Sequence, residues 1–157
     1  MRLNAQTDYS LRILMYLATK QGEIATIQEV STRLKLSQSH LMRIAAKLAS
    51  TGLVETTRGR SGGLVLGKDA TRITVEEVLR AIEPDFALVE CFKPSEGGCT
   101  VEPACRLKGV LGKALKAFFD ELRDVTLADL TQPNRARLAD IFWLSPRTGD
   151  QPMGGLH

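Results

Sequence analysis

Several signals that would assign the chain to a common functional class are missing from its sequence. No apolar run approaches the roughly 20 residues that a membrane-spanning helix needs, so no membrane role is expected. There is no glycine-rich nucleotide-binding loop and no catalytic His, Asp and Ser set, and histidine occurs only at His40 and His157. These absences argue against an enzyme. Since no secretory signal stands at the N-terminus, we expect a cytoplasmic protein whose thiols stay reduced.

Cysteine is also scarce, but its three occurrences are concentrated in one segment. Cys91, Cys99 and Cys105 all lie within residues 86–108, among glycines, prolines and charged side chains that are poor material for a core. Thiolates gathered in a short, turn-rich loop are typical ligands of iron–sulfur clusters, zinc or copper(I). The odd count argues against disulfides, and burial as small hydrophobic side chains is the other interpretation. Three sulfurs leave one coordination position open, which predicts a labile site that nitric oxide or oxygen could attack.

The charge is distributed unevenly along a chain of otherwise ordinary composition. The 157 residues, 43% hydrophobic and 25% charged, suit one soluble domain or two small lobes. Residues 1–72 carry 11 Lys and Arg against 5 Asp and Glu, whereas residues 73–157 carry 10 against 13. A basic first half joined to an acidic second half indicates that one lobe meets a polyanion, most simply DNA.

The first half has the helical periodicity of a helix-turn-helix. A first helix is expected over residues 8–19, capped by Thr7 or Asp8. A capping box at residues 26–29 opens a second helix, and Ser37 caps a third after a brief connection. The outward face of the third helix carries side chains that suit base and phosphate contacts in a major groove; these are Gln38, Ser39, His40, Arg43 and Lys47.

A β-hairpin is expected directly after the third helix. Residues 53–57 and 63–66 have strand composition, and the loop between them is rich in glycine and arginine. This order predicts a winged helix. Its tip, Arg58, Gly59 and Arg60, would place arginines where they can enter a minor groove.

The second half predicts a cluster segment followed by a long helix. A capping box at residues 74–77 opens a helix that ends before Pro84. After the cysteines comes an apolar stripe over about five helical turns; its members are Leu107, Leu111, Ala114, Leu115, Phe118, Leu122 and Val125. We expect a second copy of the chain to cover this stripe, with packing wholly inside the monomer as the alternative.

The expected fold is therefore mainly α with a small β-hairpin wing, a winged helix-turn-helix plus a long C-terminal dimerisation helix. The DNA-binding domain spans 1–72, and the cluster-binding segment and dimerisation helix span 73–131. In the remaining tail, 132–157, residues 136–144 could dock as a short helix and residues 145–157 have the composition of a mobile end.

Several short motifs together resemble the Rrf2 family of bacterial winged-helix regulators over residues 1 to about 131. They are Met1-Arg2-Leu3, Thr7-Asp8-Tyr9, the wing at 58–63, the first two cysteines, and the run 103–107 around Cys105. Within the family, the chain is most similar to the repressors that sense nitric oxide. The resemblance implies a homodimer that holds an iron–sulfur cluster, usually [4Fe-4S] with [2Fe-2S] as the alternative, and that leaves a palindromic DNA operator when nitric oxide attacks.

The resemblance also implies Asp8, contributed by the partner subunit, as the fourth ligand, although the sequence equally allows Asp8 to be a helix cap. The spacing C-x7-C-x5-C has a longer first gap, which also resembles iron-responsive repressors of the same family. Iron supply therefore stays as a rival signal, and a cluster-free thiol or zinc regulator stays as a second alternative.

Overall fold

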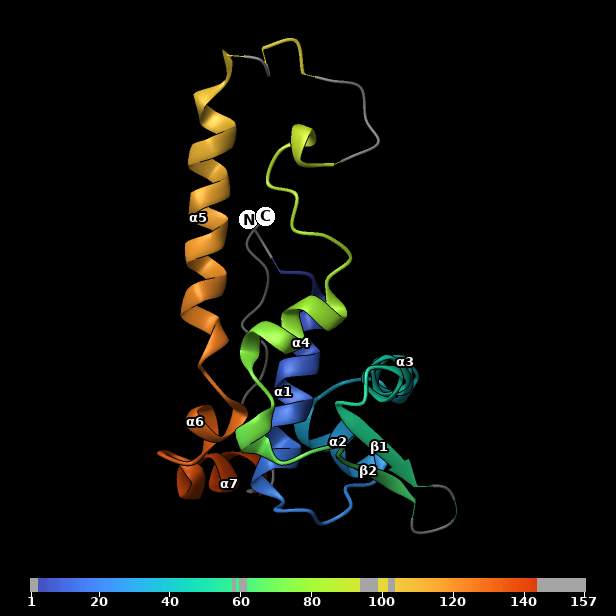
Figure 1. Cartoon of the computed structure of the whole chain (residues 1–157). Helices are drawn as coiled ribbons and strands as arrows, with labels where there is room; N and C mark the ends of the chain where they lie inside the picture. Colours follow the sequence, from blue (N-terminus) through green and yellow to red (C-terminus); the bar gives the residue numbers. More distant parts are fainter. Residues whose placement is uncertain (1–2, 58, 60–61, 94–98, 102–103, 144–157) are drawn as a thin grey trace, which may run out of the picture.

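The computed structural model describes residues 3–57, 59, 62–93, 99–101 and 104–143, and it confirms a mainly helical chain with one antiparallel hairpin (Figure 1). The helices are α1 (Ala5–Thr19), α2 (Ile27–Leu34), α3 (Gln38–Ser50), α4 (Val75–Ile82), α5 (Arg106–Arg123), α6 (Leu127–Thr131) and α7 (Arg135–Trp143), with short 3-10 turns η1 (Ala70–Arg72) and η2 (Glu90–Phe92). The strands are β1 (Val54–Thr57) and β2 (Gly63–Leu66). None of the described helices combines the length and apolarity that crossing a membrane requires.

Polar caps start the helices of the winged helix, and one of them differs from expectation. As predicted, Thr26 and Ser37 are the caps of α2 and α3: their hydroxyls accept the backbone N–H groups of Glu29 and His40, at 3.1 and 3.3 Å. For α1 the prediction of Thr7 or Asp8 as cap was wrong. Asn4 is the cap, and its side-chain oxygen accepts the Thr7 N–H at 2.9 Å. Asparagine is as good a cap as aspartate, so the helix begins three residues earlier and Asp8 lies in its first turn.

The connection between α2 and α3 is a tight left-handed turn. Lys35 has φ 54° and ψ 43°, and the Leu36 N–H reaches back to the Ser31 carbonyl at 3.0 Å. The Ser31 hydroxyl in turn donates to the Leu36 carbonyl at 2.6 Å. Together these bonds fix the angle between the two helices of the helix-turn-helix.

The wing is a two-stranded hairpin joined to the body by a backbone bridge. β1 and β2 pair from Val54 opposite Leu66 to Thr57 opposite Gly63. Ala25 and Leu64 exchange two further hydrogen bonds, of 2.9 and 2.8 Å. At Gly63 a Cβ would lie 2.2 Å from the Ala25 carbonyl oxygen, so this close approach requires glycine.

A single hydrophobic core joins the helix-turn-helix to the helices of the second half. Its buried members come from all three helices of the helix-turn-helix half, the hairpin, α4 and α6, and include Ile13, Leu14, Leu17, Val30, Leu41, Ile44, Leu48, Leu64, Val78, Ile82 and Leu127. Backbone bonds from Val75 to Val125 and from Leu127 to Ile73 place the starts of α4 and α6 side by side. The helices α4 and α6 of the second half therefore share one core with the helix-turn-helix.

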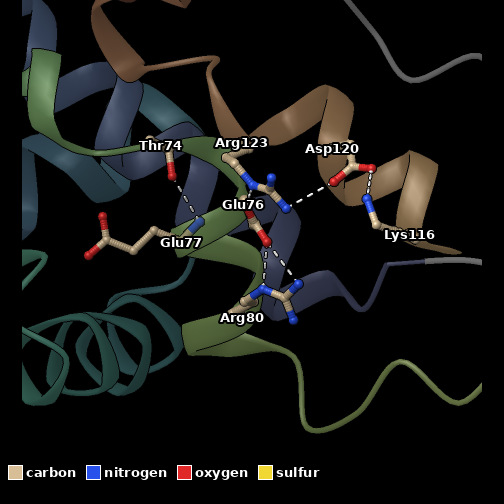
Figure 2. A network of polar contacts seen from close by, with 7 residues as sticks. All are labelled: Thr74, Glu76, Glu77, Arg80, Lys116, Asp120 and Arg123. Carbon is tan, nitrogen blue, oxygen red and sulfur yellow. Dashed lines mark hydrogen bonds and ion pairs between the residues drawn. The ribbon is translucent and has the colours of Figure 1, made fainter.

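The C-terminal half of α5 packs on α4. Phe119, which the predicted stripe omitted, is the buried residue of α5 in the described chain and packs with Val75 and Leu79. The Arg80 guanidinium lies 3.9 Å from the Phe119 ring centroid, a cation–π contact. Figure 2 shows the ion pairs beside it: Glu76 accepts from Arg80 at 2.8 Å and contacts Arg123 at 3.4 Å.

The N-terminal half of α5 extends away from the body (Figure 1). Leu107 is 59% exposed and Val110 is 60% exposed. The alternative in which the apolar stripe packs wholly within one chain is therefore wrong. Near the other end of the molecule the expected C-terminal helix is confirmed as α7, whose Phe142 ring meets the Tyr16 ring edge-on at 5.3 Å. The predicted mobile end, 145–157, lies outside the described residues.

Candidate functional site

The third helix presents the predicted polar side chains to solvent. Leu41, Ile44 and Leu48 point into the core, which turns the opposite face of α3 outward. Gln38, Ser39, Arg43 and Lys47 are all exposed on that face. An exposed helix at the second position of a helix-turn-helix is the element that enters a major groove in proteins that bind DNA, and the structure leaves the predicted contacts of these four side chains as a prediction.

His40 differs from the other predicted contacts because it is half-buried. Its ring meets the Tyr9 ring of α1 edge-on, with centroids 5.3 Å apart. The Arg12 guanidinium lies 5.8 Å from the Tyr9 centroid, and Arg12 pairs with Asp8 at 2.7 Å. A continuous line of contacts therefore runs from Asp8 to the start of α3.

The wing tip is described only in part. Gly59 is exposed at φ 113°, a backbone conformation that favours glycine, and its carbonyl accepts the Gly62 N–H at 3.0 Å. The predicted DNA contacts Arg58 and Arg60 lie outside the described residues.

A polar cluster holds α2 against α1. The Tyr16 hydroxyl donates to Glu29 at 2.5 Å, and Lys20 pairs with the same carboxylate oxygen at 3.0 Å. Burial raises the pKa of the Tyr16 hydroxyl above its ordinary value, and the neighbouring Glu29 carboxylate raises it further. Burial would also raise the pKa of Glu29, but the hydrogen bonds from Tyr16 and Lys20 outweigh it and hold that pKa below its ordinary value.

Sequence reasoning missed an apolar flank on the same helix. Met42 is 59% exposed, and Ala46 is exposed one turn further on. Both line a groove of about 400 Å³ between α3 and the hairpin, together with Thr56, Thr57 and wing glycines. The signal was available, because Met42 follows Gln38 by four residues and so shares its side of the helix.

The cysteines lie in one connecting segment between α4 and α5, at the end of the molecule away from the wing (Figure 1). All three are free thiols: Cys91 lies half-buried in η2, Cys99 is exposed, and Cys105 is the half-buried residue that precedes α5. The Cys105 side chain makes no capping bond. Within the described residues, no three Cys, His, Asp or Glu side chains are already gathered closely enough to hold a metal ion.

Asp8 lies near the point where the cysteine segment leaves the body. The backbone and side-chain N–H groups of Asn4 donate to Glu83 at 2.9 and 2.8 Å, which ties the start of α1 to the end of α4. Asp8 is one helical turn from Asn4, with its side chain 47% exposed. Its carboxylate is held by Arg12 and is not used as a helix cap.

Comparisons with known proteins agree with this architecture. The family model "Rrf2: Iron-dependent Transcriptional regulator" matches residues 3–133. The chain is 46% identical over 131 residues to the HTH-type transcriptional regulator NsrR of Bacillus licheniformis, covering 83% of this chain and 92% of the relative. It is 43% identical over 133 residues to NsrR of Bacillus subtilis, covering 84% and 91%.

A solved structure shares the fold as well. CymR, described as the global cysteine regulator of B. subtilis, has a TM-score of 0.60 and 26% identity, covering 85% of this chain and 98% of its own. Because the family model spans most of a chain that also carries the winged helix and its exposed α3, the protein belongs to the Rrf2 family of DNA-binding transcriptional regulators and is not an enzyme.

Proposed function

We propose that the chain is a repressor that holds an iron–sulfur cluster and leaves its promoters when nitric oxide attacks that cluster. The observation that carries this proposal is the set of three free thiols in one segment of a chain whose family is described as iron-dependent. The nitric oxide signal is supported by the similarity to the NsrR relatives and by the motif resemblance given above.

The donor set fits such a cluster. Three thiolates are the soft ligands that iron–sulfur clusters take, and none of the three is used in a disulfide. Since metal sites are rarely preformed without their metal, the cysteines need not be gathered beforehand. When bound, the cluster supplies iron that reacts with nitric oxide. We propose [4Fe-4S], with [2Fe-2S] as the alternative, on Cys91, Cys99 and Cys105.

Asp8 of the partner subunit is the proposed fourth ligand. Its carboxylate is accessible and carries one ion pair, to Arg12. Arg12 contacts both carboxylate oxygens of Asp8, at 3.2 and 2.7 Å, so iron binding by either oxygen would compete with this pair and weaken it. A hard oxygen donor among soft sulfurs is a weak ligand, which suits a site that must respond to a small molecule.

The contacts from Asp8 to the recognition helix offer a route for the response. Arg12 freed from Asp8 would shift over Tyr9, whose ring touches His40 at the start of α3. The state of the Asp8 carboxylate can thereby bias how α3 meets DNA. Arg43, Lys47, Arg58 and Arg60 would supply the cationic contacts on which affinity depends.

We also propose that the chain acts as a homodimer through α5. Leu107 and Val110 lie close together on α5 and are 59% and 60% exposed, so they leave apolar surface in water. A second copy of the chain would cover this surface. Two copies present two recognition helices, which matches a palindromic operator. The cysteine segment of one copy could then approach Asp8 of the other.

Cysteine variants test the proposal. Anaerobically purified protein with Cys91, Cys99 or Cys105 replaced by Ala should lack the visible iron–sulfur absorbance. The same variants should bind promoter DNA at least tenfold more weakly than the parent protein. Thr100→Ala, an exposed neighbour in the same segment, should change neither. If the cysteine variants still bind the promoter as tightly as the parent protein, the proposed coupling is wrong.

The two rival functions give different results in the same assays. An iron-responsive repressor would release DNA when iron is chelated and would stay bound to DNA when nitric oxide is added. A cluster-free thiol regulator would contain no iron or acid-labile sulfide, and the exposed Cys99 would be the thiol most open to oxidants.

A further inference from the structure

The exposed face of α3 has two chemically different flanks. Arg43 and Lys47 lie on one side of the helix, as their spacing of four residues requires. Met42 and Ala46 lie on the other side, facing the hairpin, and continue into the half-buried Ala49. The cations of α3 therefore do not lie along the flank that borders the groove.

The groove itself is apolar and open. The α3 wall is made by Met42, Ala46 and Ala49, and the hairpin wall consists of Leu64, wing glycines and the two threonines Thr56 and Thr57. Met42 is 59% exposed at the mouth of this groove, so its flexible side chain leaves apolar surface in water. Bound DNA could cover that surface.

Duplex DNA offers one apolar group in its major groove, the thymine C5-methyl. That methyl lies at the side of the DNA major groove, near the sugar–phosphate backbone of its own strand. When α3 lies in the DNA major groove and the wing reaches past the phosphate backbone, the flank of α3 that faces the hairpin would lie along that wall of the major groove. Gln38, exposed one turn before Met42, can pair with the adenine edge of an A·T pair on the same side.

We propose that Met42, supported by Ala46, reads thymine methyl groups in the major groove and so gives the protein a preference for A·T pairs beneath this flank of α3. The proposal rests on the DNA-binding function of the family. Charge-based contacts by Arg43 and Lys47 add affinity, whereas Met42 adds sequence preference.

The test compares thymine with uracil, which lacks only the methyl. Duplexes are enriched from a random-sequence pool with the anaerobically purified full chain, and the enriched duplex is made again with uracil replacing single thymines. For at least one thymine in each half-site, the wild type should bind the uracil duplex about fourfold more weakly than the thymine duplex. This is the factor that burial of one methyl group predicts. Met42→Ala should bind the thymine and uracil duplexes equally, while Met42→Leu should retain the difference.

Lys47→Ala is the matched control on the opposite flank. It should weaken binding to both duplexes alike and keep the thymine preference. Equal binding of thymine and uracil duplexes by the wild type would overturn the proposal. An unchanged uracil penalty in Met42→Ala would also overturn it. Failure to enrich any duplex would contradict the DNA-binding function as well, so the two failures can be told apart.

Discussion

Glu29 is the residue that joins the two helices on which the recognition helix rests. It comes from α2 and accepts hydrogen bonds from Tyr16 of α1 and from Lys20, the residue that ends α1. Its folded-state pKa is lowered, so the carboxylate contributes stability above its ordinary pKa of 4.5 and loses it as the pH falls through the lower folded value. Tyr16 acts in the opposite direction: its pKa is raised, so its contribution is full below pH 10 and is lost at higher pH.

Glu29→Gln should therefore lower the free energy of unfolding by about 1 kcal/mol at pH 7, because a half-exposed charged hydrogen-bond acceptor is lost. The difference from the wild type should shrink as the pH falls below the ordinary carboxyl pKa of 4.5 and through the lower folded pKa of Glu29. Urea unfolding at several pH values measures it. Glu23→Gln removes a 75% exposed carboxylate near the same lysine and should show no such dependence. A difference that does not shrink anywhere below pH 4.5 while the protein stays folded would contradict the assignment.

At the scale of the element, α7 lies beyond the part of the chain that the family model matches, which ends at residue 133. Phe142 packs edge-on against Tyr16, and the Trp143 carbonyl accepts a hydrogen bond from Arg33 of α2 at 3.1 Å. α7 therefore braces both helices that support the recognition helix.

Phe142→Ala should lower the free energy of unfolding by about 2 kcal/mol, less than the 3–5 kcal/mol typical of a fully buried phenylalanine because Phe142 is half-buried. The neighbouring Ile141 is 63% exposed, and Ile141→Ala should stay within about 0.5 kcal/mol of the wild type. Thermal and denaturant unfolding of the two variants separates these outcomes. Equal effects would show that α7 is not docked as described.

The local elements could be predicted because their signals are local. Thr26, Ser37 and Thr74 each cap a helix where the sequence indicates one. The start of α1 was misplaced because Asn4, Thr7 and Asp8 are all acceptable caps, and only the tertiary bond from Asn4 to Glu83 decides between them.

The functional surfaces were harder to predict. The spacing of Met42 from Gln38 places it on the outward side of α3, but its part in a groove depends on the hairpin that packs beside it, which periodicity does not show. Phe119 was left out of the stripe because Phe118 beside it has the same chemistry, and packing against Arg80 and Leu79 selects the second ring. In the proposed function, Cys91, Cys99 and Cys105 come together only when they bind a cluster and a second copy of the chain is present. The spacing of the cysteines specifies neither condition.

At the scale of the whole molecule, the account requires two copies of the chain. Leu107→Asp or Val110→Asp would place a charge in the proposed interface, so either variant should sediment as a monomer and lose most of its affinity for a palindromic duplex. Gly109→Asp adds the same charge at an exposed position with open space around it, on another side of α5. It should remain dimeric. Analytical ultracentrifugation decides, and dimeric Leu107 and Val110 variants would move the interface elsewhere.

The central claim is that one event at the cysteine segment both destroys the cluster and releases DNA. The most direct measurement is an anaerobic titration of cluster-loaded protein with nitric oxide, recording visible absorbance and promoter binding in the same samples. The account predicts that the iron–sulfur absorbance and the bound DNA fall together at matching nitric oxide ratios. DNA that stays bound after the absorbance has collapsed would contradict it.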